Sequence, residues 1–109
     1  MLSIVVPVLN EQHGLDKLLA RLVPVLEREV PSFEIIIVDD GSTDETLALI
    51  KARHEADPRI KAISLSRNFG KEIAVAAGLK HVAGEAAIIM DSDLQHPPEV
   101  IPLFIASWH

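Results

Sequence analysis

The sequence predicts an α/β fold, a doubly wound parallel sheet with the element order βαβαβαβα. Short runs rich in Val and Ile alternate along the chain with longer stretches of helical spacing. The short runs are apolar at consecutive positions, which is typical of strands covered on both faces. The chain has 109 residues, a length that suits one domain rather than two. Such an alternation predicts right-handed crossovers, with helices on both faces of the sheet.

The strands are predicted at residues 3–8, 34–38, 62–65 and 86–90. The first helix is predicted at 15–30, because its apolar residues form one stripe opposite charged residues. Pro24 lies inside this stretch and predicts a kink or a break. The stripe consists of Leu15, Leu18, Leu19, Leu22, Val25 and Leu26.

The second helix is predicted at 44–55, with Ser42 as its N-cap and Glu45 completing a capping box. A third should run over about 71–82 and end before Gly84. A fourth begins after Pro97 and Pro98 and is apolar around most of its circumference. A helix of that kind needs neighbours on several sides. We therefore expect residues 1–109 to be one truncated part of a larger catalytic domain, and to self-associate through that exposed apolar surface.

Composition narrows the possible functions. Sixteen acidic against ten basic residues give a formal net charge of −6, which argues against a nucleic-acid surface. The absence of Cys excludes disulfides and thiolate metal sites, and fits a reducing cytoplasm. A mean hydropathy of +0.28 is high for a small domain, and the doubly covered strands account for part of it. The sequence contains neither a signal peptide nor an apolar run long enough to span a bilayer.

Polar residues follow all four predicted strands, at the sheet edge where open α/β folds bind ligands. The opposite, amino ends of the strands carry what read as ordinary surface residues. The simpler alternative is that loops are polar in any protein, and that their Asp and Ser residues cap helices. The residues at the four carboxyl ends are Pro7, Asn10 and Glu11, then Asp39 to Thr43, then Arg67, Asn68 and Lys71, and finally Asp91, Asp93, Gln95 and His96.

The last of these groups predicts a metal site. In an extended segment Asp91, Asp93 and Gln95 point to one side and can share a cation. Ligands that are all oxygen favour Mg²⁺ or Mn²⁺ over zinc. The alternative is an Asp-rich loop that caps the next helix. His96 is predicted to be a turn residue or to lie just outside the ligand set.

Two further groups predict a nucleotide site. Asp39 and Asp40 end a strand where a carboxylate can accept a hydrogen bond from a base or a ribose, and Gly41 permits close approach. Arg67 and Lys71 place positive charge near a helix start, which suits phosphate oxygens. Alternatively, Asp40 and Ser42 only shape a turn, and Arg67 and Lys71 are a solvated surface pair.

Together the four segments resemble the nucleotide-binding part of family 2 glycosyltransferases, which have the GT-A fold. The likeness is greatest to the branch of dolichyl-phosphate mannose synthases and bacterial polyprenyl-phosphate glycosyltransferases. It runs from Leu2 to the chain end, and the combination of motifs is highly specific. The segments are VPVLNE at 6–11, VDDGSTD at 38–44, SRNFGK at 66–71 and DSDLQHPPE at 91–99.

The resemblance implies inverting sugar transfer from a UDP- or GDP-sugar to a polyprenyl phosphate at the cytoplasmic face of a membrane. It implies that Pro7 and Glu11 line the nucleoside pocket, that Asp40 contacts the base, and that Asp91, Asp93 and Gln95 bind the catalytic metal. The family continues beyond this length with acceptor-side residues, so a nucleotide-binding remnant without turnover is an alternative. A Mg²⁺-dependent phosphoacceptor domain is another, although its acidic pair would follow the first strand.

Overall fold

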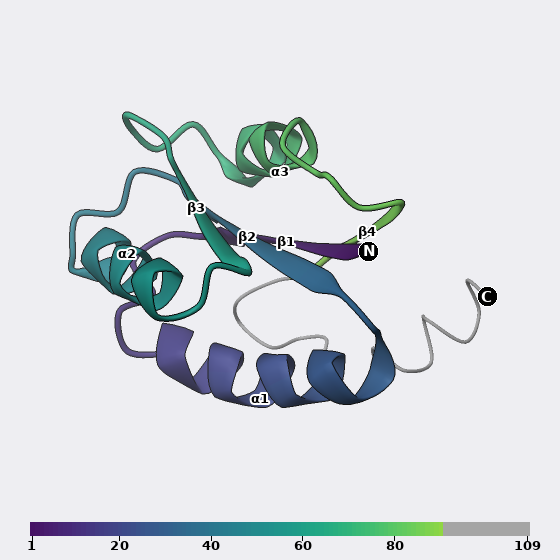
Figure 1. Ribbon diagram of the computed structural model, residues 1–109. Helices are drawn as coiled ribbons and strands as arrows, with labels where there is room; N and C mark the ends of the chain where they lie inside the picture. Colours follow the sequence, from purple (N-terminus) through teal and green to yellow (C-terminus); the bar gives the residue numbers. More distant parts are fainter. Residues whose placement is uncertain (91–109) are drawn as a thin grey trace.

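The computed structural model describes residues 1–90 of the chain. Within them strands and helices alternate, and the four strands form one parallel sheet in the order β3-β2-β1-β4 (Figure 1). The α/β fold class is therefore confirmed, whereas the helix predicted after Pro97 and Pro98 lies outside the described residues. The elements are β1 (Leu2–Val8), α1 (Leu15–Glu29), β2 (Phe33–Asp39), α2 (Thr46–Ala56), β3 (Ile60–Ser64), α3 (Lys71–Leu79) and β4 (Ala86–Ile89).

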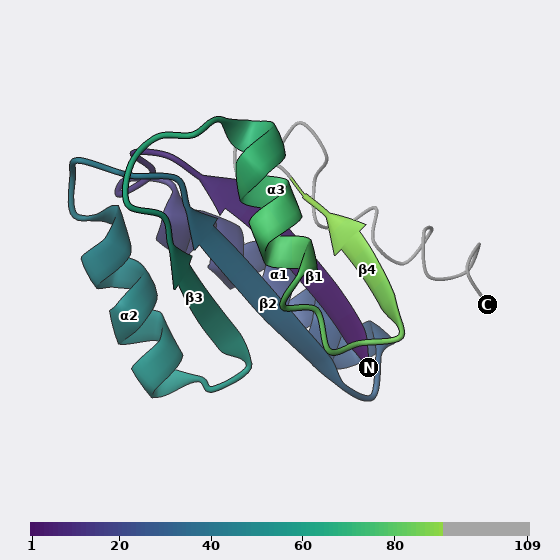
Figure 2. The ribbon, with the colours of Figure 1, turned by 90° about the horizontal axis from the view of Figure 1, so that it is seen from above.

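The sheet is covered on both faces, as the sequence predicts. Figure 2 shows α3 in front of the sheet and α1 behind it, with α2 beside β3. Alternate residues of β1 point to opposite faces, so Ile4 packs in the core with α1 and α2, while Val5 packs with Ala74 of α3. After β3, the chain passes through α3 and then forms β4, which pairs with β1 on the edge opposite β2.

Burial differs between the central and the outer strands. Every residue of β1 and β2 is buried, which confirms the prediction for these two. The same prediction is wrong for β3 and β4. In β3 only Ile60 is buried, and every residue of β4 is partly or fully exposed. In the described structure they are the edges of the sheet, so each is covered less completely than β1 and β2.

Three predictions about the helices need correction or confirmation. The predicted stripe of α1 is buried along its whole length, and the helix runs unbroken through Pro24, so the predicted break is wrong. The predicted end of α3 near Gly84 is also wrong, because the helix stops at Leu79 and a turn follows. Gly84 instead lies against β1, where a Cβ would come within 2.5 Å of the Met1 carbonyl oxygen and Ser3 Oγ.

The capping box predicted for α2 does not form. The helix begins at Thr46, with Glu45 at the N-cap position and without a side-chain cap. Asp44 accepts hydrogen bonds from the backbone N–H and the hydroxyl of Thr46 instead. Ser42 is occupied elsewhere, since its Oγ accepts the backbone N–H of Asn10.

The amino ends of the strands are not ordinary surface, which corrects another expectation. Glu34 in β2 is 1% exposed and accepts hydrogen bonds from Ser3 Oγ, Lys61 Nζ and the Ala83 N–H, at 2.6, 2.8 and 2.7 Å. Ser3 Oγ in turn accepts the Gly84 N–H. Burial alone raises the pKa of Glu34, but the hydrogen bonds from Lys61, Ser3 and Ala83 outweigh it and hold the pKa below its usual value. This buried network joins β1, β2, β3 and the segment before β4.

The strand order also fixes where a ligand can enter. From β1 the chain builds outwards to β2 and β3, and then returns to place β4 on the other side of β1. The boundary between β1 and β4 is therefore the topological switch point, where open α/β sheets bind ligands at the carboxyl ends. No helix within residues 1–90 is long and apolar enough to cross a membrane.

Candidate functional site at the carboxyl edge of the sheet

The loops that follow β1, β2 and β3 lie together at one edge of the sheet, at the upper left in Figure 2. They contain the predicted nucleotide-binding residues Asn10, Glu11, Asp40 and Arg67, and Lys71 follows the third loop as the first residue of α3. Pro7 is the second-to-last residue of β1, and Asp39 is the last residue of β2. The sequence prediction thus placed three groups correctly at one edge.

Pro7 lies two residues beyond the last described pair of β1 and β4, which joins Val5 to Ile89. Residues of β1 alternate between their two neighbours, so Val8 bonds towards β2 and Val5 towards β4. The Met90 N–H donates to the Val5 carbonyl at 2.9 Å, and the next amide on that side of β1 belongs to residue 7. Proline has no N–H to donate, so β1 cannot donate a backbone hydrogen bond towards β4 at this position.

Asn10 joins the first loop to the second. Its backbone lies in the left-handed region at φ 53°, and its N–H donates to Ser42 Oγ at 2.8 Å. Its side-chain Oδ1 accepts the Thr43 N–H at 2.9 Å. In the structure Asn10 therefore holds the two loops together, and its contact with a nucleotide stays a prediction.

Five further residues extend this connection between the first and second loops. The N–H of Glu11 donates to Thr46 Oγ1, and the N–H of Gln12 donates to Asp44 Oδ2. Gln12 Oε1 accepts the Glu45 N–H at 3.0 Å, so the contacts run in both directions. The Thr46 hydroxyl holds the pKa of Asp44 below its usual value. Sequence reasoning missed the part played by Gln12 and Thr46, although an Asp two residues before a Thr is a recognisable local hydrogen-bonding pattern.

The two carboxylates that end β2 are buried. Asp39 is 2% exposed and its Oδ1 accepts the Ser42 N–H at 3.3 Å. Asp40 is 4% exposed, and its two oxygens accept the N–H groups of Phe69 and Gly70 at 2.8 and 3.0 Å. The base contact that the resemblance implies for Asp40 stays a prediction. The contacts present here join the second loop to the third.

The third loop and the first residue of α3 carry positive charge at this edge. Arg67 is exposed, and its guanidinium carbon lies 4.7 Å from the centre of the Phe69 ring. Lys71 is also exposed and is the first residue of α3. Both cations thus lie beside the N-terminus of α3, whose helix dipole also favours an anion.

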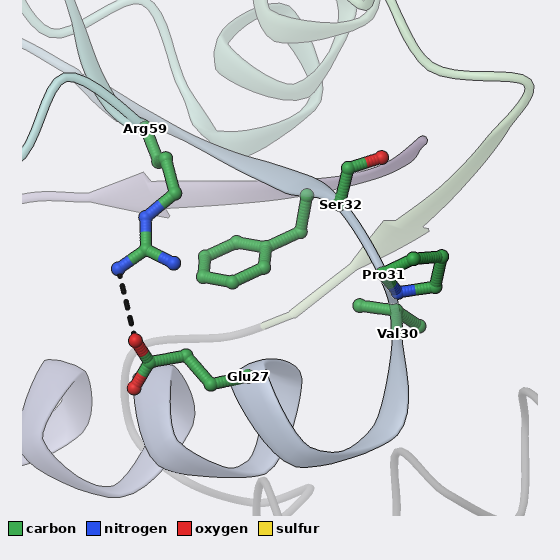
Figure 3. Close-up of a pocket in the computed structure, with 6 residues that line it drawn as sticks. Glu27, Val30, Pro31, Ser32 and Arg59 are labelled. Carbon is green, nitrogen blue, oxygen red and sulfur yellow. Dashed lines mark hydrogen bonds and ion pairs between the residues drawn. The ribbon is translucent and has the colours of Figure 1, made fainter.

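A hollow of about 380 Å³ lies at the amino end of β2, the end opposite these loops. Figure 3 shows Arg59 extending over an aromatic ring towards Glu27, with Val30, Pro31 and Ser32 around it. The Arg59 guanidinium bonds to Glu27 and Asp57 at 3.2 and 2.8 Å and lies 4.4 Å from the Phe33 ring centre. Because these partners already neutralise the charge of Arg59, we do not take the hollow as a ligand site.

The predicted metal ligands Asp91, Asp93 and Gln95, together with His96, lie outside the described residues. Over residues 1–90 the structure contains no group of three or more His, Cys, Asp or Glu side chains that could hold a metal ion. Two carboxylates and an amide are nevertheless a donor set that suits a hard divalent cation. They follow Met90, which is 2% exposed and bonded to β1 at the switch point.

Comparison with known protein families decides the identity of this arrangement. The family model described as "Glycosyl transferase family 2" matches residues 3–109. The chain belongs to glycosyl transferase family 2. This membership argues against the phosphoacceptor alternative and agrees with the resemblance that the four motifs indicated.

Two relatives of this glycosyltransferase chain are similar over nearly its whole length. It is 47% identical over 107 residues to an uncharacterised glycosyltransferase of Synechocystis, covering 98% of this chain and 34% of that protein. It is 45% identical over 105 residues to undecaprenyl-phosphate 4-deoxy-4-formamido-L-arabinose transferase of Salmonella choleraesuis. This match covers 95% of this chain and 32% of that protein. The chain therefore spans about a third of the length of these relatives.

A solved structure shows the same fold. Glucosyl-3-phosphoglycerate synthase from Mycobacterium tuberculosis, in complex with Mn²⁺, UDP and glucosyl-3-phosphoglycerate, is 27% identical to the family 2 chain. The match has a TM-score of 0.74 and covers 99% of this chain and 39% of the synthase. The likeness confirms the GT-A arrangement that the sequence predicts.

Proposed function

We propose that this chain is the nucleotide-sugar-binding part of a larger glycosyltransferase that transfers a sugar to a polyprenyl phosphate. The observation that carries the proposal is the 45% identity to a transferase named for undecaprenyl phosphate, across 105 residues. The hydrogen-bonded loops after β1, β2 and β3 support a nucleotide site at this edge, because open α/β sheets bind ligands at the carboxyl ends of their strands. Because the chain spans a third of its relatives' length, the acceptor side would be supplied by sequence outside residues 1–109.

The donor is a nucleoside-diphosphate sugar of the UDP or GDP type. We assign its nucleoside side to Pro7, Asn10, Glu11, Asp39 and Asp40. Arg67 and Lys71 would face the diphosphate, because they bring positive charge to the start of α3. The synthase from Mycobacterium tuberculosis, which was solved with UDP, supports a nucleotide in this fold.

The cofactor would be Mg²⁺ or Mn²⁺, held by Asp91, Asp93 and Gln95. When bound, the ion would offset the negative charge that develops on the leaving diphosphate. The catalytic role of Asp91 and Asp93 is therefore to hold positive charge beside the donor. The acceptor phosphate is already an anion, so attack with inversion demands less of a general base than attack by a sugar hydroxyl would.

Calorimetry tests this assignment. We expect UDP or GDP to bind more tightly with Mn²⁺ or Mg²⁺ present, and both EDTA and Asp91→Ala to weaken that binding at least tenfold. Glu99→Ala changes a carboxylate of the same segment outside the proposed ligand set, and should leave the metal dependence intact. Nucleotide affinity that ignores EDTA and Asp91→Ala would overturn the metal assignment.

A nucleotide-binding remnant without turnover is the second candidate, favoured by the short span of the chain relative to its relatives. The two candidates differ in product. A transferase releases UDP or GDP from the donor when polyprenyl phosphate and the missing sequence are present, whereas a remnant binds the nucleotide and releases none. Coupled detection of the released nucleoside diphosphate distinguishes them.

We further propose that the chain, taken alone, self-associates, and that the longer protein works at the cytoplasmic face of a membrane. Self-association is supported by exposed apolar side chains that include Ile73 and Ile89, at 51% and 47%. The membrane location is supported by the lipid-linked acceptor in the name of the Salmonella relative. Sedimentation velocity over rising concentration checks the first point, and a monomer throughout would contradict it.

A further inference from the structure

The backbone of the first loop, between β1 and α1, is held by side chains that follow β2. The partners in these bonds lie 32 to 35 residues apart in the sequence. Because the acceptors are side chains, the shape of the first loop depends on which residues stand at positions 42–46. Three consecutive N–H groups donate in this way, Asn10 to Ser42 Oγ at 2.8 Å, Glu11 to Thr46 Oγ1 at 2.8 Å, and Gln12 to Asp44 Oδ2 at 3.4 Å.

Thr46 is the buried acceptor among these three. It is the first residue of α2 and 0% exposed. Its hydroxyl donates to Asp44 Oδ1 and accepts the Glu11 N–H. The bond from the hydroxyl holds the pKa of Asp44 below its usual value, so this side chain is an anion at neutral pH. An ionised carboxylate only accepts, so the single hydroxyl hydrogen points to Asp44 and a lone pair of the oxygen is left for Glu11. Asp44 therefore orients the hydroxyl that holds Glu11.

The backbone of Glu11 is held from two helices. Its N–H is bonded to Thr46 at the start of α2, and its carbonyl oxygen accepts the N–H groups of Gly14 and Leu15 at 3.1 and 3.0 Å. Leu15 is the first residue of α1 and is 0% exposed. The peptide groups on either side of the Glu11 Cα are thus attached to two buried points of the fold. Removing the Thr46 hydroxyl removes one of these two attachments.

We propose that Thr46 is a positioning residue for the nucleoside side of the donor site. Its hydroxyl, oriented by Asp44, fixes the backbone of Glu11 and so the direction in which that side chain projects. The neighbouring Asn10 belongs to the same loop and depends on the same attachment. The inference rests on the proposed function, which assigns Asn10 and Glu11 to the nucleoside. Thr46 acts through this loop, because its own side chain is buried.

The first test needs no nucleotide. Thr46→Val replaces the hydroxyl by a methyl group of similar size and leaves the Glu11 N–H without its acceptor. Amide hydrogen exchange, read by NMR, should then be at least about tenfold faster at Glu11, relative to the amide of the buried Ile35 in β2. This ratio corrects for any loss of global stability. Thr46→Ser keeps the hydroxyl and should restore the wild-type ratio. An unchanged ratio in Thr46→Val would overturn the proposal.

The second test asks which part of the donor Thr46 affects. Calorimetry with Mn²⁺ compares UDP with pyrophosphate, which carries the two phosphates of the donor and no nucleoside. Thr46→Val should weaken UDP about tenfold and leave pyrophosphate unchanged, and Thr46→Ser should bind both as the wild type does. Equal losses for the two ligands, or no loss for either, would overturn the proposal. Thr46→Ala removes the same hydroxyl and serves if Thr46→Val does not fold.

Ile50→Val is the matched control, because Ile50 lies one turn further along α2 and is also 0% exposed. It removes a buried methyl group from the same helix and keeps the Thr46 hydroxyl, so UDP should bind as before. A loss of UDP affinity as large as that of Thr46→Val would overturn the proposal in favour of a general effect of α2 stability. A wild-type chain that binds neither UDP nor pyrophosphate would contradict the proposed function. A wild type that binds UDP no better than Thr46→Val does would contradict this inference alone.

Discussion

At the scale of single residues, the polar side chains at this edge make hydrogen bonds to the protein's own backbone. Asn10 and Asp40 each accept a backbone N–H from another loop, and Asp39 accepts one from Ser42 in the loop that follows it. Their residue types would suit either task, because an Asp or Asn oxygen accepts equally from a backbone amide or a nucleoside. A polar residue at a strand end therefore marks the edge correctly without revealing its partner.

Gly41 and Gly70 allow a prediction at this scale. Both have positive φ, at +76° and +103°, so Ala at either position should cost about 1–3 kcal/mol of unfolding free energy through backbone strain. Gly41→Ala should cost at least about 1 kcal/mol more than Gly70→Ala, because its Cβ meets the backbone of Arg67 while that of Gly70 meets nothing within 4 Å. Urea unfolding of both variants measures the difference, and equal losses would contradict the loop contact.

At the scale of elements, patterns of side chains located the helices better than they located the helix ends. The stripe of α1 is set by local spacing, and all six of its predicted residues are buried. The start of α2 was predicted too early. Ser42 was expected to cap the helix, but its Oγ accepts the N–H of Asn10 in another loop, and Asp44 accepts the Thr46 N–H instead. A capping pattern shows only which local hydrogen bond a side chain could make. The side chain can instead bond to a neighbouring loop that the fold brings close.

Gly78 gives a prediction about how α3 packs on the sheet. A Cβ at this position would lie 2.5 Å from Val5 Cγ1 and 3.0 Å from Val38 Cγ2. Helix propensity alone would make Gly78→Ala more stable by about 1 kcal/mol. We expect the opposite sign, a loss of about 1–3 kcal/mol, because α3 must move away from β1 and β2. Thermal and urea unfolding measure it.

The control for Gly78→Ala lies on the exposed side of the same helix. Ala76→Gly should cost about 1 kcal/mol through propensity alone, since Ala76 is exposed. A gain of stability in Gly78→Ala, mirroring the loss in Ala76→Gly, would show that close packing at Gly78 does not matter.

At the scale of the whole molecule, the buried network around Glu34 connects parts of the chain that lie far apart in sequence. Ser3 and Gly84 are 81 residues apart, and Glu34 joins Lys61 of β3 to Ala83 before β4. The network therefore ties both outer strands to the central pair, at the end of the sheet opposite the candidate site. It gives β4, whose four residues pair with β1 alone in the described sheet, an additional anchor.

Glu34→Gln should destabilise the chain by about 2 kcal/mol at neutral pH, because it removes the charge that three donors share. The wild-type contribution follows from the lowered pKa: it is complete above the unfolded pKa of about 4.3 and is lost as pH falls through the folded value. Urea midpoints measured from about pH 6 down to about pH 3 should therefore fall more steeply in the wild type than in Glu34→Gln.

Glu29→Gln is the control for the Glu34 prediction. Glu29 pairs with Arg28 at the surface, so its loss should change stability by less than about 0.5 kcal/mol. A pH profile of Glu34→Gln that matches the wild type would contradict the importance of the network.

The sequence by itself determined the order of strands and helices, the apolar stripe of α1 and the edge at which polar residues collect. These follow from side-chain periodicity and from the rule that parallel strands end at one edge, and both can be read within a few residues. The four motifs also sufficed to indicate the family that the family model shows.

Only the tertiary structure decided the strand order β3-β2-β1-β4, the exposure of β3 and β4, the burial of Glu34, and which loop Asp40 holds. Each depends on pairing between residues about 30 to 80 positions apart. Local patterns carry no information about such pairs, because the same carboxylate is satisfied by any donor that the fold brings within reach. The fold selects the donor, and with it the task of the residue.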